Sequence, residues 1–191
     1  WWITNHKMPD SNVFEFNTNS QAAISGFGGG GLKQEDFTST TISGGNGSTN
    51  SDLWNKSGDS YIAYCFAQVN GFSKFGKHIG NNNANGSFIY TGFKPSFVMY
   101  KGMTGSGTTD NWEIIDNARH TNSPGNPQDD VLYPNLNNAE GQDVTDRMDF
   151  YANGFKIRTN GSDYNGDGQT YIYMAFGQTL VGSNNIPATA F

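Results

Sequence analysis

The chain has 191 residues, of which 35% are hydrophobic and 14% aromatic, and its formal net charge is −6. This composition predicts a folded chain with a sizeable core, because disordered chains contain few aromatic residues. Seventeen acidic against eleven basic side chains argue against a nucleic-acid partner, since neutralising phosphate needs an excess of Lys and Arg. The apolar runs are also too short for a membrane-spanning helix.

Apolar residues alternate in short runs between clusters of Gly, Asn, Ser, Thr and Asp, which indicates β-strands. The pattern predicts an all-β chain, folded as an antiparallel β-sandwich of the jelly-roll type with an internal repeat of strand modules. In chain order the predicted strands are residues 1–5, 13–17, 22–26, 37–43, 60–68, 72–79, 87–91, 97–101, 112–117, 131–134, 148–151, 154–159 and 170–178. The long polar loops between them are where binding residues usually lie.

The most specific pattern is a repeat, because residues 58–68 return as residues 168–178, 110 positions later. A glycine, a Tyr-Ile pair, a phenylalanine and a glutamine keep their places in both copies. One structural unit is therefore predicted to occur twice. Alternation predicts that Ile62, Tyr64 and Phe66 face a core, and that Cys65 is a buried, inert thiol.

The repeat suggests three parts that pack as one globular unit. Residues 1–57 are interpreted as the end of a preceding, divergent repeat, residues 58–180 as a β-sandwich module and residues 181–191 as a tail. Because the chain begins abruptly on Trp1 and Trp2, we expect it to be a fragment of a longer protein. Adjacent residues of a strand point to opposite faces, so one of these tryptophans is expected to face a missing neighbour or another subunit. This predicts a homo-oligomer.

The dipeptide Asn153-Gly154 lies between two apolar runs and predicts a tight hairpin over residues 148–159. Both residues are expected at central turn positions with positive φ, which Asn and Gly tolerate best.

Two residues near the centre of the chain are candidates for ligand binding. Arg119 follows an apolar strand that contains Trp112, and its guanidinium is suited to pair with a carboxylate such as Glu140, bracing a long loop. The alternative is that Arg119 and Trp112 present a fork and a flat ring to a sugar or an acidic glycan.

The sequence Asp163-x-Asn165-x-Asp167-Gly168 has the alternating oxygen ligands and the glycine of a calcium loop. The twelfth position, where a bidentate Glu belongs, is Met174. A polar hairpin loop accounts for the same residues. Calcium is therefore the candidate metal, and no other cofactor is predicted.

No motif indicates an enzyme. His6, His78 and His120 are dispersed, lack metal-ligand spacing and are interpreted as surface residues. No Gly-x-Ser-x-Gly elbow supports acyl transfer. Some aspartates could pair as glycosidase carboxylates, although solvated loop charge is the simpler interpretation; they are Asp129, Asp130, Asp143, Asp146 and Asp149.

The stretch from about residue 58 to residue 180 resembles an uncharacterised domain of tail, fibre and other virion proteins of tailed bacteriophages, especially marine ones. The resemblance is carried by residues 61–66, 75–77, 91–101, 112–119, 132–135, 139–140, 149–150, 153–156 and 170–176, in this order. It implies a module of a virion appendage on the phage tail or particle surface and brings no catalytic residues with it. Residues 28–32, four glycines and a leucine, stand where the first half should match residues 132–135, so the two halves correspond less well there.

We therefore expect a structural module of a tail fibre or surface protein that contacts other virion proteins and takes part in host-surface glycan attachment. By analogy with phage fibres the homo-oligomer is expected to be a trimer. Two alternatives stay open. A polysaccharide-degrading tail depolymerase would release reducing ends, and a cellular adhesin or lectin domain would carry a secretion signal upstream.

Overall fold

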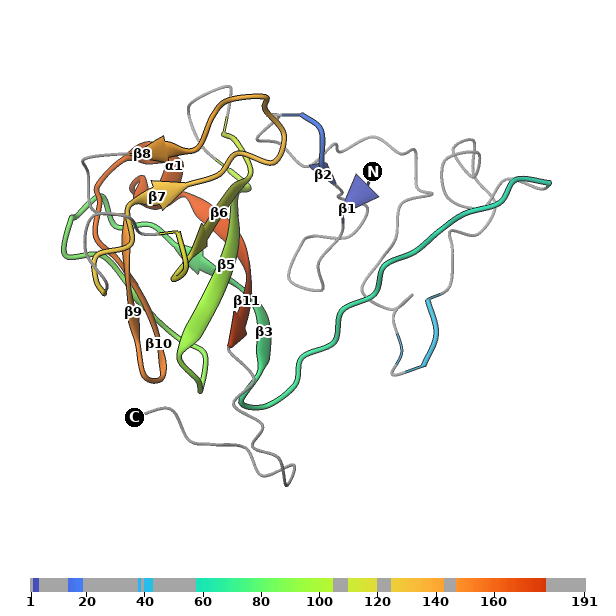
Figure 1. Cartoon of the computed structure of the whole chain (residues 1–191), viewed down its shortest axis with the longest axis horizontal. Helices are drawn as coiled ribbons and strands as arrows, with labels where there is room; N and C mark the ends of the chain where they lie inside the picture. The colour runs from blue at the N-terminus through green and yellow to red at the C-terminus, as the bar shows by residue number, and fades with distance from the viewer. Residues whose placement is uncertain are drawn as a thin grey trace.

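A computed structural model describes residues 2–3, 14–18, 38, 40–42, 58–104, 110–119, 125–142 and 147–177. These residues form antiparallel strands and one short helix, which confirms the predicted all-β class (Figure 1). That helix is far too short to cross a membrane. The elements are β1 (Trp2–Ile3), β2 (Phe14–Glu15), β3 (Ser73–Ile79), β4 (Phe88–Tyr90), β5 (Pro95–Gly102), β6 (Glu113–Asp116), β7 (Asp130–Val131), β8 (Gly141–Gln142), β9 (Met148–Tyr151), β10 (Gly154–Ile157), α1 (Ser162–Asn165) and β11 (Thr170–Gly177).

Two sheets contain most of the strands. One has four strands in the order β3-β11-β5-β6, and the other has three in the order β4-β10-β9. Figure 1 shows β9 and β10 as a layer separate from β3, β5 and β11. The pairs β1–β2 and β7–β8 are two further, short ladders.

The repeat ends in β11, the strand that lies between β3 and β5. Tyr173 at its centre is buried opposite Gly76 of β3. A Cβ at residue 76 would lie 2.5 Å from the hydroxyl oxygen of Tyr173, which is closer than any real contact. Glycine at position 76 therefore makes room for a large ring in the middle of the sheet.

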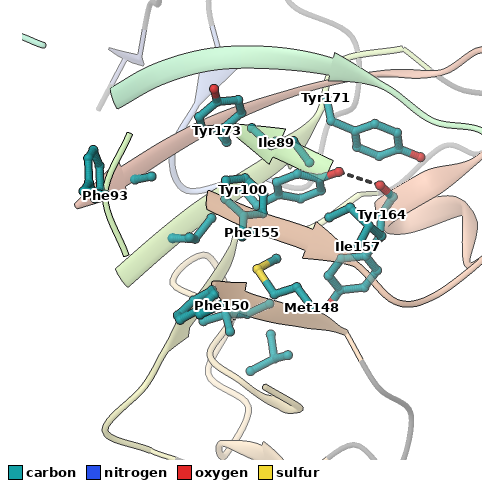
Figure 2. Packing of buried hydrophobic residues seen from close by; sticks show 14 residues of the cluster. Ile89, Phe93, Tyr100, Met148, Phe150, Phe155, Ile157, Tyr164, Tyr171 and Tyr173 are labelled. Carbon is teal, nitrogen blue, oxygen red and sulfur yellow. Dashed lines mark hydrogen bonds between the residues drawn. The ribbon is translucent and has the colours of Figure 1, made fainter. Parts of the chain in front are cut away.

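The main hydrophobic cluster lies between the two sheets. Phe155 of β10 meets Tyr173 of β11 edge to face, with 5.3 Å between the ring centroids, and so joins one sheet to the other. Burying each such side chain contributes roughly 1.5–3 kcal/mol. Figure 2 shows this packing, and the buried members are Ile89, Phe93, Val98, Tyr100, Ile115, Val131, Met148, Phe150, Phe155, Ile157, Tyr164, Tyr171, Tyr173 and Ala175.

A second cluster lies on the opposite, outer face of the four-stranded sheet. The β1–β2 hairpin covers part of this face, and Phe14 contacts Trp112 edge to face at 5.5 Å. The buried members are Phe14, Met99, Met103, Trp112 and Ile172, with Ile3, Phe16, Phe97, Ile114 and Met174 packed against them. The N-terminal hairpin is therefore packed onto the four-stranded sheet.

The hairpin predicted over residues 148–159 is present as β9 and β10, with residues 152 and 153 between them. The predicted turn chemistry is wrong, because neither Asn153 nor Gly154 has positive φ and Gly154 is already part of β10. Glycine is needed there for another reason. A Cβ at residue 154 would lie 2.2 Å from the carbonyl oxygen of Ile89 in the adjacent β4.

The other predicted strands from residue 72 onward correspond to observed strands. Of the predicted strand 131–134, only Val131 belongs to a strand, β7, and Leu132 forms an isolated bridge. In the predicted strand 37–43, the described residues contain only an isolated bridge at Ile42. Residues 22–26 lie outside the described residues. The sequence did not predict β8 or α1, because a two-residue strand and a one-turn helix have no detectable periodicity.

The largest departure concerns residues 60–68, which were predicted to form a core strand and belong to no strand. Ile62 is 74% exposed and Phe66 is 61% exposed, and Tyr64 is exposed as well. Cys65 is also exposed, so the prediction of a buried thiol is wrong. Alternation creates two faces only where neighbouring strands complete a sheet, and no ladder of the described residues includes this segment.

Candidate functional site

The predicted ligand-binding pair, Trp112 and Arg119, is divided between two environments. Trp112 is 2% exposed and packs against Phe14, so its ring has no face open to a sugar. Arg119 forms an ion pair with Asp116 and another, at 3.5 Å, with Glu140. The predicted pairing of Arg119 with Glu140 is confirmed, and it ties the residues after β6 to the residues before β8.

The three predicted calcium ligands do not form one site, because Asn165 is buried whereas Asp163 and Asp167 are exposed. Asn165 is fully buried, and its side-chain amide donates to Asn81 Oδ1 and to the carbonyl oxygen of Asn83, both at 2.8 Å. Its Oδ1 accepts the backbone N–H of Asn81 at 3.0 Å. Asp163 and Asp167 are exposed, and Asp163 lies two residues from Asn165 on α1, a spacing that turns the side chains to different sides. Asn165 therefore links α1 to residues 81–83.

His78 was predicted to be a surface residue and is buried. Its ring stacks on Tyr171, with 5.0 Å between centroids, and on Tyr100 at 5.4 Å. The Tyr100 hydroxyl lies 2.9 Å from His78 Nε2 and donates to the carbonyl oxygen of Tyr164. Burial lowers the pKa of His78 to about 4. The ring is therefore neutral at pH 7 and serves as part of the core.

The remaining candidates are distributed as follows. His6, His120, Asp143 and Asp146 lie outside the described residues. Asp130 is buried in β7 and Asp129 is partly buried before it. Across the described residues, no three His, Cys, Asp or Glu side chains converge in the way that a metal site requires.

A group of ionisable side chains is buried around the start of β6. Burial raises the pKa of Glu113 to about 8 and lowers the pKa of Lys101 to about 8. Lys101 donates to the carbonyl oxygen of Asp110, and the Arg147 guanidinium lies 4.5 Å from the centre of the Tyr164 ring. Lys101, Asp110 and Glu113 lie inside the protein and Arg147 is partly buried, so we interpret these groups as a structural network.

The candidate binding surface that we find clearest is a group of exposed aromatic side chains on the outer face of the three-stranded sheet. We call Phe88, Tyr90 and Tyr151 the aromatic platform. Gly154 of the central strand β10 lies opposite both Tyr90 of β4 and Tyr151 of β9, so these two rings belong to one row across the sheet. Tyr90 is 59% exposed, and Phe88 and Tyr151 are exposed as well.

Gly154 is what allows the aromatic platform to form. A Cβ at this position would lie 2.8 Å from Cζ of Phe88, which shows that the Phe88 ring extends over the glycine. Phe88 thereby reaches Tyr151, with 5.9 Å between centroids and 65° between ring planes. The missing side chain on β10 thus lets aromatic residues of the two flanking strands meet.

Charged groups border the aromatic platform. In the neighbouring row of the sheet, Lys156 of β10 lies between Phe88 of β4 and Asp149 of β9. The Lys156 amine donates to Asn85. Asp149 accepts a hydrogen bond of 2.9 Å from the Tyr151 hydroxyl and pairs with Arg158 at 3.4 Å. The bond to Asp149 raises the pKa of Tyr151. The platform therefore combines flat apolar rings with oriented donors and acceptors.

Tyr90 also lines a small cavity beside the platform, of about 230 Å³. The cavity lies between the edge strands β3 and β4, and the Lys74 amine is 5.6 Å from the centre of the Tyr90 ring. The other lining residues are Gln68, Val69, Asn70, Gly71, Ser73, Thr91 and Gly92. A ligand on Tyr90 would therefore have amide, hydroxyl and amine groups within reach.

The sequence-based reasoning missed this surface because it assigned aromatic side chains to the core. The alternation in Phe88-Ile89-Tyr90 could have indicated two outward rings around one inward Ile. Nothing in the sequence indicated that β10 separates β4 from β9, and this order is what brings Tyr151 to Phe88.

Neither the curated proteins nor the solved structures include a match to this chain. Residues 1–179 do match a family described as a domain of unknown function (DUF7483). The matched range begins in the β1–β2 region and continues past the end of β11. The chain therefore belongs to the DUF7483 family.

Proposed function

We propose that the chain is a non-enzymatic β-sandwich module of a phage virion appendage, a tail fibre or particle-surface protein, and that its aromatic platform binds a host-surface glycan. The observation that carries the binding part is the row of exposed rings held across β4, β10 and β9. Contiguous exposed apolar patches on a folded protein often mark a site that contacts a ligand or a partner.

The virion part rests on the sequence resemblance. The residues that carry it include most of β5, β6 and β11 and parts of β9 and β10, so they extend over both sheets. The sandwich part is supported by two antiparallel sheets that share one hydrophobic cluster. A module of this kind offers rigid strands as a base for binding groups.

The chemistry of the aromatic platform suits a sugar. The C–H groups on the flat side of a pyranose pack against aromatic rings, which are large, apolar and rigid. Hydroxyl groups at the sugar's margin would reach Lys156 or Arg158, and charge-assisted hydrogen bonds of this kind are roughly twice as strong as neutral ones. Lys156 and Arg158 also favour an acidic sugar over a neutral one.

The binding proposal is tested by calorimetric titration of the protein with oligosaccharides selected on a glycan array from host-surface polysaccharides. We expect Tyr90→Ala and Tyr151→Ala each to weaken binding about tenfold or more, because removing a central aromatic contact typically costs over 1 kcal/mol. The matched control is Leu136→Ala, which removes an exposed apolar side chain outside the platform. Unchanged affinity in both tyrosine variants would contradict the proposal.

Tyr151→Phe separates stacking from hydrogen bonding. This variant keeps the ring and loses the hydroxyl that donates to Asp149. We expect most of the affinity to remain if the ring stacks on the sugar. A loss as large as that of Tyr151→Ala would assign the binding to the polar group instead.

The virion assignment is tested by mass spectrometry of purified phage particles and by cryo-microscopy of the same particles. Density for this fold on a tail or capsid surface is expected, and the symmetry at that position would test the expected homotrimer. Incubating the protein with the bound polysaccharide gives a separate result. New reducing ends would overturn the non-enzymatic proposal in favour of a depolymerase.

A further inference from the structure

The cavity beside Tyr90 has a size and a charge that suit one anionic group. Its volume is about 230 Å³, which is below the roughly 300–1,000 Å³ of sites that enclose a whole small molecule. Among the described residues that line it, Lys74 is the one charged side chain and none carries a carboxylate. The lining is therefore positively charged, in a chain whose formal net charge is −6.

The position of Lys74 in β3 directs its side chain toward this cavity. Lys74 lies opposite Ala175, a buried member of the main cluster, so it belongs to the face of the four-stranded sheet that is turned toward the other sheet. Because β3 is an edge strand, the apolar stem can cover the margin of the core and the amine can reach solvent. The amine ends 5.6 Å from the centre of the Tyr90 ring and so extends from one sheet to the other.

The Lys74 amine has the Tyr90 ring beside it and, among the described residues, no carboxylate. None of the ion pairs in the described part of the chain includes Lys74. The electron-rich face of an aromatic ring attracts an ammonium group without neutralising its charge. The positive charge is therefore held at the cavity and is available to an anionic ligand.

Two glycine turns keep the cavity accessible. Gly71 has a φ of +77° and Gly92 a φ of +86°, in the left-handed region that favours glycine. A Cβ at residue 71 would meet no atom within 4 Å, so the space beside this turn is open. A Cβ at residue 92 would lie 3.6 Å from the hydroxyl oxygen of Tyr90, and a longer side chain would lie against that ring.

The side-chain donors that remain for a ligand are an amine and two amides. Ser73 and Thr91 also line the cavity, but each donates its one hydroxyl hydrogen to a backbone carbonyl oxygen. Lys74 and the exposed side chains of Gln68 and Asn70 carry the other donors. A cation with amide N–H groups beside it suits the oxygen atoms of an oxyanion.

We propose that this cavity binds the anionic substituent of an acidic sugar, a carboxylate or a sulfate ester, with Lys74 as its cation, while the sugar ring lies on the aromatic platform. Tyr90 belongs to both surfaces, so one ligand can occupy them together. The inference rests on the proposed glycan binding and adds the chemical class of the sugar.

NMR titration of the whole chain tests the proposal with methyl glucuronide and methyl glucoside, which differ in a carboxylate against a hydroxymethyl group. We expect methyl glucuronide to shift the backbone amide signals of Gly71 and Gly92 and to bind about tenfold more tightly, because hydrogen bonds to charged groups are strong. The advantage should shrink at high salt, which screens the charges. A sulfated methyl glucoside shows whether a sulfate ester or a carboxylate is preferred.

Variants of two lysine residues on one strand locate the effect. Lys74→Met keeps the apolar stem, and it should lower the affinity for methyl glucuronide to that for methyl glucoside, whose own affinity should stay the same. Lys74→Arg keeps the charge and should keep the preference. The matched control is Lys77→Met, which removes the same charge from the opposite face of β3, where residue 77 lies opposite Ile172 of the second cluster. This control should keep the preference as well.

The other outcomes overturn the proposal. Equal affinity for the two sugars, with amide shifts at Tyr151, would remove the anionic subsite and leave the proposed glycan binding standing. A preference that is lost in Lys156→Met and kept in Lys74→Met would place the anionic group at the border of the platform. Acetate that binds as tightly as methyl glucuronide would show a site for an ion rather than for a sugar. Binding of neither sugar would overturn the subsite, and the oligosaccharide titration described above then decides whether glycan binding fails with it.

Discussion

β11 and segment 61–68 have nearly the same sequence and very different environments. β11 lies between two strands, has its odd-numbered residues in the core between the sheets and has Ile172 in the second cluster. Segment 61–68 lies in no strand and exposes Ile62 and Phe66. The same alternating side chains are therefore a central strand in one place and an exposed segment in the other.

The difference shows that neighbours convert a strand sequence into a strand. β11 has Gly76 opposite Tyr173 to accommodate its ring, and Phe93 beside Gly177 to close the end of the strand. In segment 61–68, Phe66 contacts Phe176 and Phe75, and the Ser73 hydroxyl donates to the carbonyl oxygen of Ala67. Matched substitutions at equivalent positions measure how much these surroundings contribute.

The largest effect is expected from a buried charge. Ala175 is fully buried in the main cluster, and Cys65 is its exposed equivalent. We expect Ala175→Arg to lower the free energy of unfolding by about 4 kcal/mol or more, because the guanidinium would be desolvated without a partner. Cys65→Arg should change it by less than about 0.5 kcal/mol. Urea unfolding followed by tryptophan fluorescence measures both, and equal effects would remove the distinction between the two segments.

A pH effect is expected from His78, which stacks on Tyr171 of β11. Burial holds its pKa at about 4, against 6.5 in the unfolded chain. As pH falls from about 6.5 to 4, the unfolded chain binds a proton that the folded one does not, so stability is lost at about 1.4 kcal/mol per pH unit. The difference between His78→Gln and the unmodified protein, measured by urea unfolding, should shrink over this range. A difference independent of pH would contradict the assignment.

An intermediate effect is expected where the two copies differ by one methyl group. Residue 67 is alanine, whereas its equivalent is Gly177, where a Cβ would lie 2.7 Å from Cδ2 of Phe93. We expect Gly177→Ala to cost about 1–3 kcal/mol through overpacking, measured by thermal unfolding. Ala67→Gly should cost less than about 1 kcal/mol, through chain entropy alone. A neutral Gly177→Ala would show that the Phe93 ring moves aside.

The smallest effect concerns reactivity rather than stability. The exposed Cys65 should react with a thiol reagent in the folded protein without changing its melting temperature. Ala175→Cys in a Cys65→Ser background places a thiol at the equivalent buried position, and it should react only when the protein unfolds. Absorbance of the released chromophore follows both reactions. Slow labelling of Cys65 would indicate that segment 61–68 is covered.

The strands after residue 72 could be predicted because each has local alternation and polar boundaries. The hairpin around Asn153 was predicted for a partly wrong reason, since Gly154 is required by its contact with Ile89 rather than by positive φ. The same alternation predicted a strand at residues 60–68, and that prediction was wrong. A strand forms only where it pairs with another strand, which is usually far away in the sequence. Local pattern therefore identifies strand sequences and leaves their partners undecided.

The candidate site was less accessible to prediction. Trp112 looked available for ligands because aromatic rings bind sugars, yet its neighbours bury it. The predicted pair of Arg119 with Glu140 was correct, since a guanidinium beside a flexible loop commonly finds a carboxylate. The aromatic platform depends on strand order, which places residues 88 and 151 on either side of Gly154.

By itself the sequence determined the all-β class, the position of most strands and the internal repeat, because periodicity and turn residues act over a few neighbouring positions. Only the tertiary structure decided which copy of the repeat became a central strand, which histidine became part of the core and which aromatic rings meet at the surface. The reason is that burial and strand pairing depend on contacts between residues far apart in the chain, and two nearly identical segments can have entirely different contacts.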